Sequence, residues 1–308
     1  MDSGFFKYRT ILDHSQLILG TAQLGMDYGI ANKTGKPDMQ MAHDILRTAW
    51  EGGIRQFDTA QAYGESEKIL GKVLSDLGIL NQAKLITKLA PDINHSNNQD
   101  IADALMKSLE NLKIERLYGL MLHHEEFLDL FEGGLSDILA DFIDQGLVDN
   151  IGMSLYSPAK AKVALEYDLI SILQVPANIC DHRFYETGIF HLAEKKGIHM
   201  YIRSIFLQGL LLMGKNEIPE KMKYSASIVE ILESLCKEFN ISRQVLTLGY
   251  IKQKYPQAFV IIGAETKEQL ADNIAVWNSD QALSITGKVD AIFADMDEKI
   301  INPTLWPH

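Results

Sequence analysis

The sequence predicts an α/β protein in which residues 1–308 form a single domain, a (β/α)8 TIM barrel with eight parallel strands. Short apolar, strand-like runs alternate along the chain with longer segments of helical period. The length of 308 residues suits one barrel, and no linker-like change in composition divides it. A doubly wound sheet is the structural alternative. Its dinucleotide-binding form needs Gly-x-Gly-x-x-Gly after the first strand, and residues 20–25 (Gly-Thr-Ala-Gln-Leu-Gly) lack that spacing.

The predicted elements follow one another as strand and helix, and several boundaries have a physical cause. The strand candidates are Leu17–Thr21, Ile54–Asp58, Lys84–Lys88, Leu117–His123, Val148–Ser154, Ser171–Val175, His199–Ser204 and Phe259–Gly263. The helix candidates are Asp38–Gly52, Glu65–Leu77, Gln99–Leu112, Leu135–Gln145, Pro158–Tyr167, Tyr185–Lys196, Ser225–Asn240 and Lys267–Asn278, with an additional helix over Ser242–Lys254. Pro158 suits a first helical turn, where its missing N–H needs no partner. Gly197 suits a helix end, because glycine adopts the left-handed conformation readily.

Composition and charge narrow the class of protein. The formal net charge of -12 disfavours nucleic acid and anionic membranes as partners, because an acidic surface repels phosphate groups. Residues 1–16 lack the basic start and apolar run of a signal peptide, and no apolar stretch reaches 18 residues. The two cysteines, Cys180 and Cys236, do not make a disulfide framework. We therefore expect a cytoplasmic enzyme or binding protein that acts on small molecules.

Four titratable residues stand at or just after neighbouring strand ends, where a TIM barrel places its active site. Asp58, Lys88 and His123 end the second, third and fourth predicted strands, and Tyr63 follows Asp58 by five residues. The set suits carbonyl reduction, in which the oxygen develops negative charge and needs a proton donor. We expect Tyr63 to give the proton, Lys88 to lower its pKa, Asp58 to hold Lys88, and neutral His123 to orient the carbonyl.

Each of these residues also has a purely structural interpretation. Asp58 alone could be a helix cap, Tyr63 a half-buried aromatic side chain, and Lys88 a solvated strand end. His123 and His124 are adjacent, so on a strand they point to opposite faces and only one enters the site. Neighbouring residues rarely bind one ion together, and no His-x-His follows the first strand. We therefore expect no metal.

The chain resembles the aldo-keto reductase family over roughly residues 17 to 277. The residues that carry the resemblance are the blocks 53–67, 86–88 and 120–123, then 146–154, 203–211 and 262–273. The first three blocks match the Asp, Tyr, Lys and His tetrad of the family in type, order and strand position. The resemblance implies that Asp58, Tyr63, Lys88 and His123 are catalytic and that a nicotinamide cofactor lies across the barrel mouth.

The resemblance also implies a set of cofactor-binding residues, spread over the ends of five strands. These are Thr21, Ser154, Gln174, Arg203, Ser204, Leu207, Gly209, Gly263, Thr266, Gln269 and Asn273. Ser154 and Gln174 match contacts to the carboxamide of the nicotinamide. The segment after the seventh strand resembles the one that lies under the nicotinamide and pyrophosphate. Residues 262–273 resemble the loop around the adenosine.

Three departures from the family pattern bear on the cofactor. Leu155 follows Ser154 where the family often has Asn, and Arg203 takes the place of an aromatic residue that stacks on the nicotinamide. The planar guanidinium of Arg203 could stack in its place. Glu265 stands where the family often has a basic residue for the 2′-phosphate of NADP, which an acid repels. We expect NADP(H), with NAD(H) as the second cofactor.

The predicted function is reduction of an aldehyde or ketone, with a sugar-like compound among the candidates, by a monomer or small homo-oligomer. The expected wall of the substrate pocket consists of Met26, Tyr28, Glu125, Phe127, Met213 and Trp306. Two alternatives remain open. One is a barrel lyase or aldolase that uses Lys88 as a Schiff-base amine. The other is a regulatory subunit that binds the cofactor on the same fold with vestigial reduction.

Overall fold

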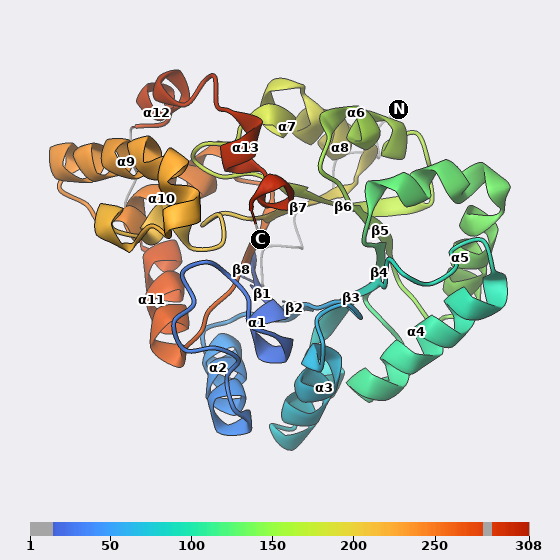
Figure 1. Cartoon of the computed structure of the whole chain (residues 1–308). Coiled ribbons are helices and arrows are strands. Elements are labelled where there is room, and N and C mark those ends of the chain that lie inside the picture. Colours follow the sequence, from blue (N-terminus) through green and yellow to red (C-terminus); the bar gives the residue numbers. More distant parts are fainter. Residues whose placement is uncertain (1–14, 280–284, 308) are drawn as a thin grey trace, which may run out of the picture.

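A computed structural model describes residues 15–279 and 285–307 of the chain. At its centre lies a closed barrel of parallel strands in the order β1 to β8, surrounded by helices (Figure 1). The strands are β1 (Leu17–Gly20), β2 (Gln56–Asp58), β3 (Lys84–Leu89), β4 (Gly119–Leu122), β5 (Ile151–Ser154), β6 (Ile170–Pro176), β7 (His199–Arg203) and β8 (Phe259–Ile262). Pairing of β1 with both β2 and β8 closes the ring. The predicted TIM barrel is therefore confirmed.

Two separate cores follow from the alternation of side chains along each strand. Ile18, Ile86, Met121, Ile172 and Tyr201 form a buried cluster of their own inside the barrel. Their immediate neighbours on the same strands, with Leu17, Leu19 and Leu85 among them, belong to the larger core outside it. Successive residues of a strand point to opposite faces, so each strand supplies one set of residues to each core.

The helices that cover the barrel agree with the predicted ones to within a few residues, with two exceptions. They are α2 (Met39–Glu51), α3 (Ser66–Asp76), α4 (Asn98–Leu112), α5 (Leu135–Asp144), α6 (Pro158–Ala164), α8 (Ile189–Lys196), α9 (Ala226–Phe239), α10 (Arg243–Lys254) and α11 (Lys267–Asn278). Shorter helices are α1 (Ala22–Gly25), α7 (Arg183–Glu186), α12 (Thr286–Ile292) and α13 (Glu298–Ile301). Asp38 and Ser157 cap α2 and α6 by accepting hydrogen bonds from backbone N–H groups of the first turn.

The first exception is the helix predicted over residues 185–196, which is two helices, α7 and α8. Gly188 lies between them with φ of 75°, a left-handed conformation that breaks the helical path. The hydroxyl of Thr187 donates to the carbonyls of Arg183 and Phe184 at the C-terminal end of α7. The second is α6, which ends at Ala164 rather than at Tyr167. The residues around Tyr167 include no glycine, so the sequence did not indicate that the helix ends early.

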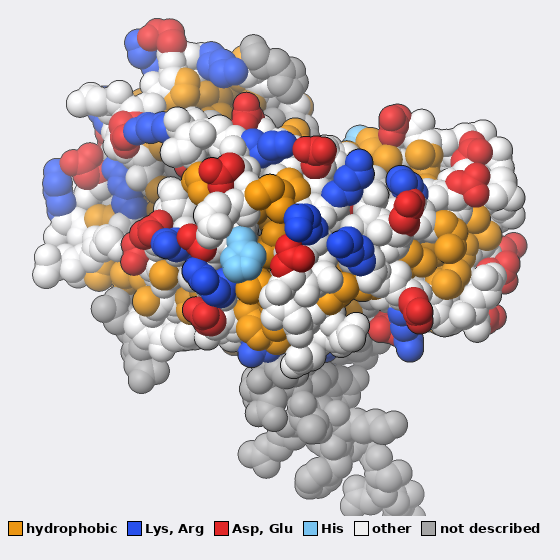
Figure 2. Space-filling view, turned by 90° about the horizontal axis from the view of Figure 1, so that it is seen from below, with side chains coloured by type: hydrophobic (Ala, Val, Ile, Leu, Met, Phe, Trp, Pro, Cys, Tyr) orange, Lys and Arg blue, Asp and Glu red, His pale blue; other side chains and the backbone are white. Residues whose placement is uncertain are grey.

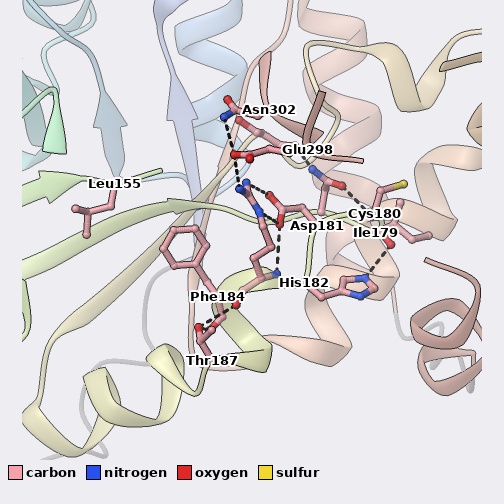
Figure 3. A network of polar contacts seen from close by, with 12 residues as sticks. Leu155, Ile179, Cys180, Asp181, His182, Phe184, Thr187, Glu298 and Asn302 are labelled. Atoms are coloured by element: carbon pink, nitrogen blue, oxygen red, sulfur yellow. Dashed lines mark hydrogen bonds and ion pairs between the residues drawn. The ribbon is translucent and has the colours of Figure 1, made fainter. Parts of the chain in front are cut away.

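Residues near the C-terminal end of the described chain are tied to the segment that follows β6 (Figure 3). The guanidinium of Arg183 binds both oxygens of buried Asp181 at 2.9 Å and one oxygen of Glu298 at 3.1 Å. Asn302 donates to the same Glu298 oxygen at 3.3 Å. Because Glu298 and Asn302 belong to α13 and the residue after it, this network fixes α13 against the barrel.

The surface shown in Figure 2 carries basic and acidic side chains interspersed, with no large area of one sign on that face. Within the described ranges, no helix is both long and apolar enough to cross a membrane. The same ranges contain no group of three or more His, Cys, Asp or Glu side chains placed to hold a metal ion. The expectation about residues 1–14, in which no signal peptide was recognised, lies outside the described residues.

Candidate active site

Each candidate site residue on a strand stands two positions after a residue whose side chain points into the barrel. Ile86 precedes Lys88, Met121 precedes His123, and Tyr201 precedes Arg203 in this way. The same spacing relates Gln56 to Asp58, Gly152 to Ser154 and Ile172 to Gln174. Since side chains alternate with period two, all six point toward the barrel axis at the carboxyl ends of the strands.

A buried ion pair lies at the bottom of the site. Lys88 Nζ is 2.6 Å from Asp58 Oδ1 and also donates to the Thr59 carbonyl at 3.0 Å. Gln174 Nε2 donates to the other oxygen, Asp58 Oδ2, at 2.8 Å. The Lys88 side chain is 1% exposed and that of Asp58 5%. Both carboxylate oxygens therefore have partners, and the ammonium is directed by groups from β2 and its following turn.

Tyr63 lies above this pair, in the turn between β2 and α3. The Lys88 ammonium is 5.1 Å from the centre of the Tyr63 ring. Gly64 follows with φ of 57°, and a Cβ atom there would lie 2.5 Å from the Gly25 carbonyl oxygen. Only glycine fits so close to the backbone of α1, so the turn that presents Tyr63 depends on it.

The net pKa of Tyr63 is raised in this structure, so the lowering expected from Lys88 does not dominate. Burial raises the pKa of Tyr63 above its ordinary value, and the negative charge of Asp58 raises it further, while Arg203 acts in the opposite direction. Burial is the largest cause, and Asp58, which lies 2.6 Å from Lys88, also offsets the charge of Lys88. Tyr63 thus keeps its proton, the form in which it serves as an acid.

His123 lies beside Tyr63, with the two ring centres 5.8 Å apart and nearly perpendicular. Burial lowers the pKa of His123 to about 3, and Lys88, His124 and Arg203 add to the effect by repelling a proton. The imidazole is therefore neutral near pH 7. His123 Nδ1 is buried without a hydrogen-bond partner among the described residues. His124 instead turns to the surface, where half of its side chain is exposed (51%).

A second polar network supports β3 from outside the barrel. The buried carboxylate of Glu67 accepts hydrogen bonds from Thr87 at 2.6 Å, Ser108 at 2.8 Å and Asn111 at 3.0 Å. Gln61 donates to Ser108 Oγ at 2.8 Å, and its amide oxygen accepts from the backbone N–H of Ala90 at 2.7 Å. This network holds the backbone on both sides of Lys88 and thereby positions its ammonium.

A cavity of about 750 Å³ opens above these residues at the carboxyl ends of the strands. It is lined by Asp58, Tyr63 and His123 of the predicted tetrad and by Thr21, Ser154, Gln174, Arg203, Ser204, Gly209, Gly263, Gln269 and Asn273 of the predicted cofactor residues. Among the described residues, three predicted ones do not line it: Lys88, Leu207 and Thr266. The structure therefore brings together twelve of the fifteen residues expected in the site.

Each residue outside the lining has a place that explains it. Lys88 lies beneath the cavity, covered by the groups that it binds. Leu207 is fully buried, with φ of 50°. Thr266 caps α11, since its hydroxyl accepts a hydrogen bond from the N–H of Gln269. The hydroxyl of Thr21, although the residue touches the cavity, donates to the carbonyl of Asp58 at 3.0 Å and so fixes β1 to β2.

The segment after β7 meets the segment after β1 across the cavity mouth. Lys33 Nζ and Glu217 Oε1 lie 2.6 Å apart, and the N–H of Ala31 donates to the carbonyl of Gln208 at 3.4 Å. A Cβ atom on Gly209, whose φ is 91°, would lie 2.4 Å from Ala31 Cβ. The two segments thus bridge the mouth, and the bridge requires glycine at position 209.

Sequence reasoning missed several residues of this cavity and misplaced others. Tyr156, Arg243 and Gln244 line it and were not predicted. Tyr156 lies two positions after Ser154, and the same period-two spacing would have pointed to it. Arg243 and Gln244 begin α10, which comes to the cavity only through the fold.

The expected substrate wall is partly wrong. Tyr28 and Met213 line the cavity, whereas Met26, Glu125, Phe127 and Trp306 are not among its lining residues. Phe127 stacks on His95, with 3.5 Å between ring centres. Trp306 is buried and donates from Nε1 to the carbonyl of Ile300. Phe127 thus packs against the segment after β3 and Trp306 against its own segment, and neither lines the cavity.

One end of the cavity is acidic. Glu265 and Asp272 both line it. Lys267, which follows Glu265 by two residues, forms an ion pair with Asp44 at 3.2 Å instead of turning to the cavity. Burial raises the pKa of Glu265 somewhat, while hydrogen bonding and the charge of Lys33 act in the opposite direction. At this end of the cavity, positively charged side chains are therefore largely paired with acidic ones.

Comparison with known proteins agrees with this geometry. The chain is 26% identical to the aldo-keto reductase YhdN of Bacillus subtilis over 210 residues, which are 66% of this chain but only 61% of YhdN. It is 25% identical to the NADH-specific methylglyoxal reductase of Escherichia coli over 297 residues, 86% of this chain and 90% of that protein. A crystal structure of an aldo/keto reductase from Klebsiella pneumoniae with NADP and acetate shares the fold, with a TM-score of 0.72 and 16% identity over 92% of this chain and 93% of that one.

The family model described as the aldo/keto reductase family matches residues 16–289, which include the whole described barrel and every residue of the cavity. The chain therefore belongs to the aldo/keto reductase family.

Proposed function

We propose that this protein reduces an aldehyde or ketone to an alcohol with a nicotinamide cofactor, NADP(H) or NAD(H), and that Tyr63 is the proton donor. The observation that carries the proposal is one arrangement of residues. Tyr63 and neutral His123 line the same cavity, directly above the buried pair of Lys88 and Asp58. An acid and a hydrogen-bond donor that converge on one point are what the oxygen of a carbonyl needs during reduction.

When bound, the reduced cofactor supplies the hydride that the carbonyl carbon accepts. Tyr63 then gives its hydroxyl proton to the carbonyl oxygen, so that the product is a neutral alcohol and Tyr63 regains a proton from solvent. Lys88 lies close enough to stabilise the tyrosinate that exists between these steps. Neutral His123 donates a hydrogen bond to the same oxygen and holds the carbonyl in line. Asp58 holds the Lys88 side chain in place.

The residues present fit such a cofactor. Ser154 and Gln174, buried at adjacent strand ends, line the part of the cavity that contains Tyr63 and His123, where a carboxamide would find polar partners. His123 Nδ1 is a buried polar atom without a partner among the described residues, as expected of a group that awaits a ligand. A Cβ atom on Gly20, which lines the cavity, would lie 2.9 Å from Ile261. Glycine is therefore favoured at this strand end, and residue 20 places no side chain in the cavity.

We further propose that NADH is accepted alongside NADPH. Glu265 and Asp272 line the end of the cavity that the resemblance assigns to the adenosine. Lys267 is paired with Asp44 at 3.2 Å, which leaves less positive charge at this end for a 2′-phosphate. An acid that accepts a hydrogen bond from a 2′-hydroxyl favours NADH. The E. coli relative is named as NADH-specific, which supports the proposal.

The two alternatives fit the geometry less well. A Schiff-base lyase needs an accessible neutral amine, whereas Lys88 is 1% exposed and is held by Asp58 and the Thr59 carbonyl. A purely regulatory subunit has no need of an acid and a hydrogen-bond donor, Tyr63 and His123, placed above the Lys88–Asp58 pair. The single domain over residues 1–308, the cytoplasmic location and the monomeric or small homo-oligomeric state stay predictions from the sequence.

A panel of aldehydes and ketones, incubated with the protein and either NADH or NADPH, tests the proposal. We expect loss of the reduced cofactor's absorbance with at least one carbonyl class, and the alcohol as product. Aldol cleavage or borohydride trapping of a substrate on Lys88 would favour the lyase. Tight cofactor binding without turnover on any carbonyl would favour the regulatory subunit.

A further inference from the structure

Arg203 is unusual among the cations that line the cavity. Lys33 pairs with Glu217 at 2.6 Å, and Arg243 lies 3.7 Å from Glu233. Arg203 also lines the cavity, yet no acidic side chain of the described ranges lies within ion-pair distance of it. Asp58, the nearest acid of the cavity floor, is already bound to Lys88. The deep end of the cavity therefore carries one positive charge that no acid balances.

The guanidinium of Arg203 is held in place by neutral groups. Its carbon lies 4.1 Å from the centre of the Tyr156 ring, on which it stacks. Nη2 donates to the Leu155 carbonyl and Nη1 to the Ser204 hydroxyl, both at 3.3 Å. Glu125 in turn fixes Tyr156 and the residue after it, since its carboxylate accepts the N–H of Tyr156 at 2.6 Å. The planar guanidinium of Arg203 is thus oriented without a bound ligand.

Arg203 has N–H groups that make no hydrogen bond with other described residues. Of the five N–H groups that a guanidinium carries, two are used in the long bonds above. Its Nε is buried without a partner. A charged fork with unused donors, supported from one side by an aromatic ring, matches the planar shape and charge of a carboxylate.

Arg203 also acts on the groups around the reacting carbonyl. Its charge counteracts the effect of burial on the pKa of Tyr63 and of Tyr28, and it adds to the effect of burial on the pKa of His123. These three side chains line the cavity with it. An anion bound by Arg203 therefore shares one cavity with a carbonyl oxygen that meets Tyr63 and His123.

We propose that Arg203 binds a carboxylate of the substrate, so that this enzyme selects oxo acids, carbonyl compounds in which a carboxylate lies near the reacting carbonyl. The inference rests on the proposed reductase function and names its substrate class. Reduction then converts an oxo acid to the corresponding hydroxy acid, with the hydride from the cofactor and the proton from Tyr63. The carboxylate itself is unchanged.

The cofactor is a poorer partner for this charge. The nicotinamide that the resemblance places near Arg203 has a neutral carboxamide, and the negative groups of a dinucleotide are its phosphates. Two other cations, Lys33 and Arg243, also line the cavity. Gln244, next to Arg243, donates to Asn273 at 2.6 Å, and the charge of Lys33 reaches Glu265. Arg203 is thus left to the substrate.

Three matched pairs of aldehydes test the proposal: 4-carboxybenzaldehyde and 4-nitrobenzaldehyde, succinic semialdehyde and butanal, glyoxylate and methylglyoxal. In each pair the first carries a carboxylate and the second does not. We expect the wild-type kcat/KM to favour the carboxylate in at least one pair by tenfold or more, and the favoured pair to show how far the carboxylate lies from the carbonyl. Arg203→Gln should lower that ratio by about tenfold to a hundredfold, chiefly through KM, as expected for the loss of a charge-assisted hydrogen bond. Arg203→Lys should restore part of it, because a lysine keeps the charge without the fork.

Arg47→Gln is the matched control, because it removes the same guanidinium from the exposed surface of α2, outside the cavity lining, and should leave the ratio unchanged. No preference for the carboxylate in any pair, or an equal loss on both members in Arg203→Gln, overturns the proposal. So does an Arg203→Gln protein that binds NADH or NADPH at least tenfold more weakly while the ratio stays the same, since Arg203 then serves the cofactor. If no aldehyde is reduced at all, the proposed function fails. Calorimetric binding of benzoate to the protein with NADH, lost in Arg203→Gln, would still support the carboxylate site, and equal binding to both proteins would overturn it.

Discussion

Lys88 Nζ lies 2.6 Å from Asp58 Oδ1, although the two residues are 30 positions apart, and both side chains are almost completely buried. A buried charge without its partner is costly, because protein interiors solvate ions poorly. The pair therefore links stability to function in this protein. It positions the Lys88 side chain beneath Tyr63, and it holds β2 and β3 together at the point where the cavity begins.

Lys88 and Asp58 should contribute to stability as one unit, so their separate losses should not add. We expect Lys88→Met to lower the free energy of unfolding by about 3–5 kcal/mol, because Asp58 is then a buried carboxylate without its cation. Asp58→Asn should cost less, since Gln174 can still bond to the amide oxygen. The double variant should lose less than the sum of the two, in both the unfolding free energy from urea titration and log kcat. Strict additivity would show that the two side chains do not form one unit.

Tyr63→Phe should abolish carbonyl reduction and leave cofactor binding nearly intact, because only the hydroxyl is lost. A positioned general acid contributes typically about 10²–10⁴-fold to the rate. The readouts are kcat from cofactor absorbance and the dissociation constant from quenching of protein fluorescence. Tyr185→Phe is the control, because Tyr185 is 46% exposed and does not line the cavity. A Tyr63→Phe protein with kcat near the wild-type value would contradict the assigned role.

The depressed pKa of His123 predicts a loss of stability in acid. Burial lowers this pKa from 6.5 to about 3 in the folded protein. The contribution of the neutral ring is therefore complete above pH 6.5 and falls as the pH drops toward 3, because the unfolded chain binds the proton first. Between pH 6.5 and 5 the loss amounts to at most about 2 kcal/mol. We expect His123→Gln to lose less stability over this interval than wild type, measured by thermal unfolding at both pH values.

His191→Gln is the control for that experiment, because His191 lies exposed on α8. It should keep the wild-type dependence on pH. The kcat of reduction should likewise show no step near pH 6.5, since neutral His123 is already the active form. A step there would mean that His123 titrates at an ordinary pKa and is solvated.

Glu265→Arg should tighten NADPH binding and leave NADH binding unchanged or weaker. Two unit charges about 4 Å apart interact by about 1 kcal/mol in water, which corresponds to roughly fivefold in affinity. Replacement of the acid by a base should therefore improve NADPH binding by more than that factor. Titration of both cofactors by fluorescence quenching measures it. Glu268→Arg makes the same charge change on the exposed surface of α11, outside the cavity lining, and should have little effect. A wild-type preference for NADPH of a hundredfold or more would show that Glu265 points away from the phosphate.

Lys33→Gln and Glu217→Gln should each speed cofactor release, because this ion pair bridges the mouth of the cavity. Both side chains are largely exposed, at 71% and 46%, and exposed pairs contribute up to about 1 kcal/mol. The dissociation rate should thus rise by up to about fivefold in stopped-flow displacement. The difference between wild type and either variant should shrink at 1 M salt, where exposed charges are screened. Release that is equally fast in all three proteins at low salt would remove any role of the pair as a closure.

The sequence by itself determined the barrel, the order of its strands and the face to which each strand residue points. Alternation of apolar runs with helical segments predicted all eight strands and the main helices. Period two along each strand placed Asp58, Lys88 and His123 at strand ends with their side chains toward the axis. These features depend on neighbours within a few residues, and local backbone geometry expresses them directly. The sequence pattern missed some helix boundaries, such as the break at Gly188. A side chain near a helix end can make several alternative hydrogen bonds with the backbone, and the pattern does not specify which one forms.

Only the tertiary structure decided which side chains meet. Gln174 reaches Asp58 across 116 positions, Arg203 stacks on Tyr156, and Lys33 meets Glu217 across the mouth. It also decided that the pKa of Tyr63 is raised, because burial and the Asp58 charge depend on how the whole barrel closes. Periodicity specifies a direction for each side chain but not the distance to a group from a remote segment. That distance follows from the packing of every element between them, which no short stretch of sequence contains.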